Sequence, residues 1–173
     1  MNRRSIRRQA GFTLIELVVV LAIIVLAIAA VVARQMSASQ TSKVTSEVSN
    51  MQAIVGKIKS TFGGRPNYTG ATTAFLLAQG AFPTSMVNGA NVTHTWGGAV
   101  AVAAGAGNTS VDITYDAVPT SACIELVAAA SRSFNEVTVG ATKTMNGQPI
   151  ADLTVTQAAC SAAANENIVF NAS

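Results

Sequence analysis

The hydrophobic positions of the chain form two patterns that meet near residue 34. Residues 17–33 are apolar without a break, whereas over residues 35–62 apolar positions recur in steps of three and four among polar ones. That spacing places the apolar side chains on one stripe of a helix. The stripe consists of Val44, Val48, Met51, Ile54, Val55 and Ile58. Because no proline interrupts residues 12–62, we predict one helix, roughly 75 Å long, that ends at Gly63 and Gly64.

Residues 65–173 carry shorter, mixed patterns that predict a single globular head. Helices are expected over 72–79 and from Pro119 to about Ser133, and the signal over 153–164 fits either a helix or a strand. Strands are expected over 98–103, 110–115, 136–139 and 168–170, with turns at 105–108 and at Asn146 and Gly147. The prediction is an α+β fold in which the second half of the long helix packs on an antiparallel sheet.

The first half of the long helix has the length and flanks of a membrane anchor. Counting residues 12–15 with the apolar run gives about the twenty residues that a bilayer span requires. Arginines 3, 4, 7 and 8 precede the run and only Arg34 follows it. By the positive-inside rule the N-terminus is then cytoplasmic and everything after Arg34 lies outside. We therefore predict a transmembrane helix over residues 12–34.

Two other interpretations of this segment remain open. Ala27, Ala29 and Ala30 could form the small-residue cleavage site of a secretory signal, but the apolar run is longer than such signals have. The segment could also be a plain uncleaved anchor. Neither interpretation accounts for Glu16, the one acid at the edge of the run.

Glu16 requires a partner if it enters an apolar environment. An unpaired carboxylate in a bilayer costs a few kcal/mol, so a neighbouring amine would stabilise it. The alternative is an acid that reaches the interface and pairs with nothing.

Residues 11–17, Gly-Phe-Thr-Leu-Ile-Glu-Leu, follow a short basic leader and resemble the processing site of type IV pilins and pseudopilins. The resemblance implies that prepilin peptidase cuts between Gly11 and Phe12, removes the leader 1–11 and methylates the new N-terminus at Phe12. It also implies that Glu16 pairs with the N-terminal amine of a neighbouring subunit. The expected partners are other copies in a helical filament, the peptidase and the inner-membrane assembly machinery.

Removal of the leader changes the charge of the chain. The sequence holds 11 Lys+Arg and 8 Asp+Glu; without the four arginines of the leader, 7 basic residues face 8 acidic ones. The pI of about 9.2 therefore reflects the leader, and we expect no nucleic-acid binding. Charged residues make up only 11% of the chain, against about 25% in typical domains, which suits a subunit buried on several sides.

Cys123 and Cys160 both lie in the part that the topology places outside the cytoplasm. Two cysteines in an oxidising compartment normally pair, and a bridge closing nearly forty residues should stabilise the head by roughly 3 to 4 kcal/mol. Two buried free thiols are the alternative. The placement of the pair also resembles the disulfide-bounded C-terminal region of type IV pilins.

The head resembles the type IVb branch, which includes bundle-forming, toxin-coregulated and conjugative thin-pilus pilins. The similar segments are residues 68–74, 80–83 and 118–123. Two features depart from the type IVb branch: the leader is short, and Phe12 is the residue typical of type IVa pilins. One feature departs from the type IVa branch, because the proline that commonly kinks the type IVa anchor is missing. The sequence leaves the subtype open.

Nothing in the sequence predicts catalysis, a cofactor or a metal site. His94 is the only histidine, and with Thr93, Thr95 and Trp96 around it a surface or hydrogen-bonded role is favoured. No paired metal-ligand spacing occurs, and the aspartates are too scattered for general acid–base chemistry.

We therefore expect a structural filament subunit, anchored in the bacterial inner membrane before assembly and extracellular in a pilus afterwards. Adhesion, aggregation and conjugation are the uses that the resemblance suggests. One alternative is a pseudopilin of a type II secretion or competence system. Another is a minor pilin with an adhesin or DNA-binding role, although the head has only Arg65, Arg132 and Lys143 as basic residues, few for neutralising phosphates.

Overall fold

The computed structural model describes residues 13–65, 67–145 and 150–173, and for residues 30–37 it describes the backbone alone. The chain divides into two compact units, residues 1–39 and 40–173. The predicted cleavage residues Gly11 and Phe12 lie outside the described residues, as does the turn predicted at Asn146 and Gly147.

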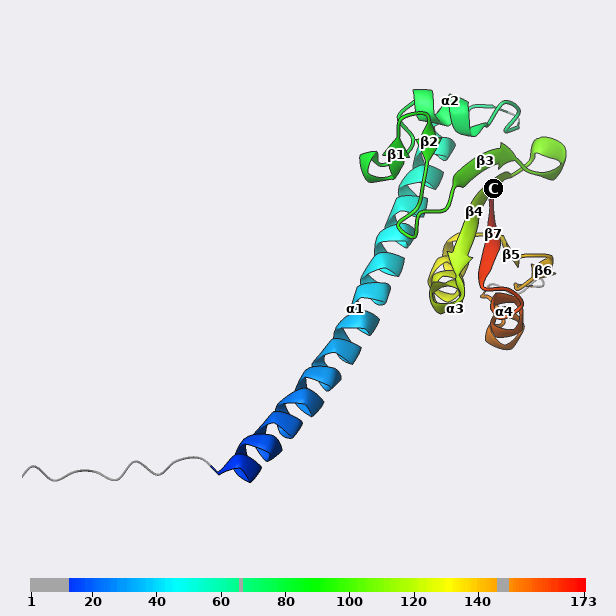
Figure 1. The fold of residues 1–173 in the computed structure, drawn as a ribbon. Helices are drawn as coiled ribbons and strands as arrows, with labels where there is room; N and C mark the ends of the chain where they lie inside the picture. Colours follow the sequence, from blue (N-terminus) through cyan, green and yellow to red (C-terminus); the bar gives the residue numbers. More distant parts are fainter. Residues whose placement is uncertain (1–12, 66, 146–149) are drawn as a thin grey trace, which may run out of the picture. The chain divides into compact units, whose positions relative to one another are not determined.

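The described residues form a long N-terminal helix, followed by shorter helices and the strands of an antiparallel sheet (Figure 1). The helices are α1 (Leu14–Phe62), α2 (Thr73–Ala78), α3 (Thr120–Ala130) and α4 (Leu153–Cys160). The strands are β1 (Val87–Asn88), β2 (Asn91–Val92), β3 (Val100–Ala104), β4 (Val111–Pro119), β5 (Glu136–Val139), β6 (Thr142–Lys143) and β7 (Asn165–Ala172). The predicted fold class is confirmed.

Five strands form one antiparallel sheet in the order β3-β4-β7-β5-β6, and β1 and β2 form a separate hairpin. The C-terminal strand β7 lies between β4 and β5, so that Phe170 is opposite Ile113 on one side and Val137 on the other. The predicted hairpin of β3 and β4 is confirmed, with Val100 opposite Tyr115.

Side chains of β4 alternate between a buried and a half-buried face, as the pleat of a strand requires. Val111, Ile113 and Tyr115 are buried, whereas Asp112 and Thr114 are half-buried. The buried face belongs to the core of residues 40–173, to which α1 contributes its predicted stripe. Of that stripe, Val44, Met51, Ile54 and Ile58 are buried and Val48 and Val55 are partly buried.

Strand β4 is longer than predicted because a bulge lets it continue to Pro119. The register with β7 shifts between Tyr115 and Val118, and within the bulge Ala117 has a φ of 56°. The Ala117 N–H donates to Asn167 Oδ1 at 3.0 Å. Next to the bulge, a Cβ on Gly98 would lie only 1.9 Å from the carbonyl oxygen of Asp116. Glycine at position 98 therefore permits the close backbone approach.

Side-chain caps begin the two short helices α2 and α4. Asp152 accepts hydrogen bonds from the N–H groups of Thr154 and Val155 and so begins α4, which decides the mixed signal over 153–164 in favour of a helix up to Cys160. Thr72 caps α2 in the same way. The two-residue strands β1, β2 and β6 were not predicted, since so short a pairing leaves no periodic pattern.

Candidate functional site

Glu16 lies in the first turn of α1, where Thr13 caps the helix. The Glu16 N–H donates to Thr13 Oγ1 at 3.3 Å, and the Leu17 N–H donates to the Thr13 carbonyl oxygen at 3.2 Å. A threonine followed three residues later by a glutamate is the pattern of a capping box. Glu16 therefore has a local structural role available to it, besides the predicted pairing with another subunit. The sequence analysis missed this pattern, although the spacing is visible in it.

The apolar side chains after Glu16 are open to solvent. Over residues 13–29 every described side chain is exposed, and the large ones range from Val20 at 44% to Leu14 at 81%. Exposed apolar surface on this scale marks an interaction site with protein or lipid. Within the described part of the chain, no helix has both the length and the apolar character that crossing a bilayer needs.

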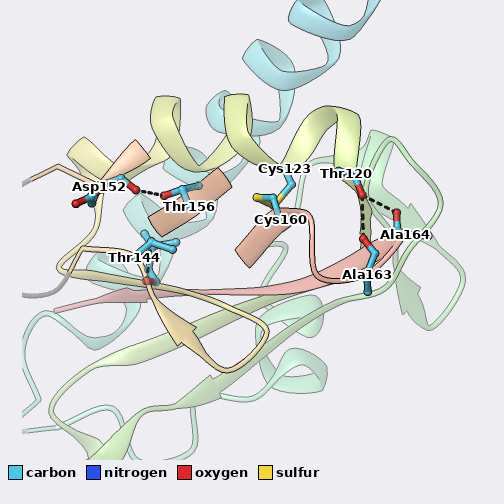
Figure 2. Close-up of a disulfide and its surroundings, with 9 residues drawn as sticks. Thr120, Cys123, Thr144, Asp152, Thr156, Cys160, Ala163 and Ala164 are labelled. Carbon is cyan, nitrogen blue, oxygen red and sulfur yellow. Dashed lines mark hydrogen bonds between the residues drawn. A yellow bond between two sulfur atoms is a disulfide. The ribbon is translucent and has the colours of Figure 1, made fainter. Parts of the chain in front are cut away.

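A disulfide joins α3 to α4 (Figure 2). Cys123 and Cys160 are both fully buried, with their Cα atoms 5.8 Å apart, so the predicted bridge is present. On one side of it Thr120 Oγ1 donates to the carbonyl oxygens of Ala163 and Ala164, each at 3.0 Å. On the other side Thr156 Oγ1 donates to the Asp152 carbonyl oxygen at 2.6 Å. The bridge joins the two helices, the Thr120 bonds tie the start of α3 to the residues after α4, and the Thr156 bond closes the first turn of α4.

His94 is buried and hydrogen-bonded. Its Nδ1 accepts from the Trp96 N–H at 3.2 Å, so Nε2 carries the proton that it donates to the Asp116 carbonyl oxygen at 2.7 Å. Its ring stacks on that of Tyr115, with 5.3 Å between centroids. Both nitrogens of a neutral imidazole are thereby used in holding the loop against β4. This satisfies the hydrogen-bonded role that the sequence favoured, although the side chain lies deeper than a polar turn suggests.

Two family models match the chain, and together they cover most of it. The model described as "PilS N terminal" matches residues 39–173, and the model of the prokaryotic N-terminal methylation motif matches residues 6–32. The chain is a type IV pilin of the PilS family. Type IV pilins are structural subunits of extracellular pili, so this pilin has other pilin subunits and prepilin peptidase as partners.

Solved structures of type IV pilins share the fold of this pilin. A type IVb pilin from Salmonella typhi is 22% identical, with a TM-score of 0.60 over 74% of this chain and 98% of that one. TcpA, a type IV pilin from Vibrio cholerae El Tor biotype, is 17% identical, with a TM-score of 0.56 over 76% of this chain and 99% of that one. Curated proteins gave no match. At these identities the likeness concerns the fold of the pilin head.

A buried carboxylate in the pilin head was missed by the sequence analysis. Glu47 is 1% exposed; its Oε1 accepts from the Thr95 N–H at 2.8 Å and its Oε2 accepts from the Tyr115 hydroxyl at 3.3 Å. Burial, followed by the charge of Glu47 and this hydrogen bond, raises the pKa of Tyr115 well above its usual value. Glu47 stands on the predicted stripe three residues after Val44, so its burial could have been inferred from spacing alone.

Gln40 extends this connection between α1 and the rest of the head. Its Oε1 accepts from the Trp96 Nε1–H at 3.3 Å, and its Nε2 donates to Ser121 Oγ at 3.2 Å. Farther along α1, Gln52 Nε2 donates to Ser133 Oγ at 3.3 Å. Residues 40–62 of α1 are thus attached to the head by polar contacts at the edges of the stripe as well as by the stripe itself.

Proposed function

We propose that the mature chain is the structural subunit of a pilus, released for assembly when prepilin peptidase cuts between Gly11 and Phe12 and methylates Phe12. The methylation motif over residues 6–32 supports this bond as the site, since it spans both residues. Before assembly, residues 12–34 would anchor the subunit in the bacterial inner membrane with the N-terminus in the cytoplasm. The inner-membrane machinery then lifts the subunit into the filament.

The observation that carries this proposal is the row of exposed apolar side chains that begins at Leu14. The large ones from Leu14 to Ile28 are all at least 44% exposed, although each stabilises an assembly by roughly 1.5 to 3 kcal/mol when fully buried. Packing of these segments from neighbouring copies would form the filament core. A head-to-tail contact that does not close on itself would propagate such packing into an open filament.

Within that core, we infer that the carboxylate of Glu16 accepts the methylated amine of Phe12 from a neighbouring subunit. A buried carboxylate needs a partner. The new N-terminal amine is positively charged, and Phe12, which carries it, is only four residues from Glu16 in the sequence. The pairing would fix the register of each added subunit, while the apolar contacts supply most of the stability.

Three variants separate the pairing from the capping role. Glu16→Gln keeps the side chain that a capping box accepts but removes the charge, Glu16→Ala removes both, and Thr13→Ala removes the cap alone. We expect normal processing in all three, measured as the mass of the first mature residue. Electron microscopy of cell-surface fibres should show few or none with either Glu16 variant and near-normal numbers with Thr13→Ala. Abundant fibres from Glu16→Gln would contradict the pairing and leave only the cap.

The cleavage site has its own test. Gly11→Trp places a large side chain beside the scissile bond, where glycine allows the closest approach of a protease. The expected product retains residues 1–11 and stays in the membrane fraction, as mass spectrometry would show. Normal maturation of this variant would contradict cleavage after Gly11.

The length of the fibres that the wild type forms distinguishes a pilus from the short assembly expected of a pseudopilin.

A further inference from the structure

The outer face of the five-stranded sheet carries a polar hollow. Tyr115 of β4 points toward α1, where it meets Glu47, so the neighbouring outward positions of the sheet lie on the opposite face. There β4, β5, β6 and β7 border an open-sided hollow of about 320 Å³. Asp112, Asn171, Thr138 and Lys143 line it, and Val169 contributes an apolar surface. The volume falls within the range of sites for small ligands, about 300 to 1,000 Å³.

One wall of the hollow is a fixed hydrogen-bonded group from two strands. Asn171 Nδ2 donates to Ser110 Oγ at 2.8 Å and to Asp112 Oδ1 at 2.5 Å. Both hydrogens of the amide are used, which fixes its orientation. Within the described part of the chain, Asn171 Oδ1 and Asp112 Oδ2 have no such bond, so two acceptors are held in place beside each other.

The other wall supplies donors. Lys143 Nζ pairs with Glu136 at 2.9 and 3.0 Å to its two carboxylate oxygens, and the lysine side chain is 64% exposed. An ammonium group has three hydrogens, so one remains for a ligand after the two contacts to Glu136. The Thr138 hydroxyl lies in the same wall and can donate or accept.

We propose that this hollow binds a neutral saccharide through neighbouring hydroxyl groups. Each sugar hydroxyl both donates and accepts, which matches acceptors on Asp112 and Asn171 facing donors on Lys143 and Thr138. The apolar C–H face of the ring would rest on Val169. Two carboxylates disfavour an anion, and the polar walls disfavour an apolar ligand. A cation would meet Glu136 already paired with Lys143, which leaves Asp112 as the one uncompensated charge.

This inference goes beyond the filament role and does not depend on it. Binding can be measured with the full mature chain in detergent micelles, where no filament is needed. A chain that binds sugar but forms no fibres, or the reverse, would separate the two proposals.

The test uses saturation-transfer NMR with five methyl glycosides: those of glucose, galactose, mannose, N-acetylglucosamine and N-acetylgalactosamine. We expect at least one of them to bind with a Kd of about 1 mM, a value typical of a few polar contacts. Asp112→Asn removes the charge-assisted bond and should weaken that binding about tenfold. Thr114→Ala changes the next outward position of β4 and is the matched control, with unchanged binding expected.

A second variant guards against loss of folding in Asp112→Asn. Val169→Trp fills the hollow from its apolar side without entering the buried core, and should abolish binding while the melting temperature stays within a few degrees. Nα-acetyl-lysine methylamide serves as a cationic probe. Absence of binding by all five glycosides would overturn the proposal, as would glycoside binding that survives both variants. Binding of the cationic probe alone, lost at high salt, would assign the hollow to a basic partner instead.

Discussion

Two parts of the same helix differ in what covers their apolar side chains. Ile24 in the first part is 46% exposed, whereas Ile54 in the second part is 0% exposed. Both are isoleucines on α1, and both segments have high helix-forming character. The difference lies in the side chains around the rest of the helix. Over residues 40–62 the apolar stripe is flanked by polar side chains, whereas over residues 17–33 every side chain is apolar. A one-sided stripe suits a single partner surface, and an all-round apolar surface requires partners on several sides.

That contrast divides the work of the helix between stability and assembly. The second part stabilises the head through Met51, Ile54 and Ile58, which belong to its core. The first part offers its apolar surface to other molecules, first to lipid and then to other copies under the proposed function. Substitutions in the two parts should therefore affect different measurements.

The largest expected effect comes from truncating the same residue type in each part. Ile54→Ala should lower the free energy of unfolding of the head by about 4 kcal/mol, since it leaves a cavity in the core. Ile24→Ala should leave it unchanged and reduce fibre number instead. Denaturant unfolding in detergent, followed by near-UV circular dichroism, measures the first effect. Equal destabilisation by both variants would remove the distinction.

The disulfide sharpens the comparison because it joins α3 to α4 and includes no residue of α1. Cys123→Ser should cost about 3 kcal/mol, chiefly by releasing a constraint on the unfolded chain. Reduction of the wild type should give the same loss, measured as the shift in unfolding midpoint with and without reductant. A midpoint that does not respond to reductant would contradict a stabilising role for the bridge.

Substitutions at Glu47 test whether the polar contacts of residues 40–62, as well as their apolar stripe, stabilise the head. Glu47→Ala leaves the Thr95 N–H and the buried Tyr115 hydroxyl without their acceptor, and should cost about 2 kcal/mol. Glu47→Gln keeps one acceptor oxygen and should lose less. Asp116 makes its bond to His94 through the backbone, so Asp116→Ala is a matched control that should unfold like the wild type. Hydrogen exchange at the Thr95 amide reports the contact directly.

The sequence predicted what depends on periodicity and on strong local signals. The stripe of α1, the stop at Gly63 and Gly64, strand β5 over residues 136–139 and the pairing of β3 with β4 are all confirmed. Each of these rests on repeated spacing or on glycine and turn residues. The bridge between Cys123 and Cys160 followed from topology and redox compartment, without knowledge of where α3 and α4 lie.

Features that depend on tertiary contacts could not be predicted. The central position of β7 joins residues near the C-terminus to β4 and β5, and no local signal specifies such partners. Ala117 adopts a positive φ because the bulge and Asn167 hold it there; on its own, alanine avoids that region. The burial of Glu47 could be read from its place on the stripe, but its partners Thr95 and Tyr115 could not, because they lie 48 and 68 residues away. The hollow beside Asp112 arises only when four strands meet.

The smallest expected effect is an alkaline loss of stability through Tyr115. The pKa of Tyr115 is raised in the folded head by burial and by Glu47, so the folded state keeps the proton after the unfolded chain releases it near pH ~10. Stability from this group is therefore complete below about pH 10 and is lost above it, by about 0.8 kcal/mol at pH ~10.5. Tyr115→Phe removes the titration while keeping the ring. The difference in unfolding free energy between wild type and variant, followed from about pH 8 to 11, isolates Tyr115 because every other side chain is common to both chains. A difference that stays constant over this range would mean that the hydroxyl ionises as easily in the folded head as in the unfolded chain. The contact with Glu47 would then be too open to water to link α1 to β4.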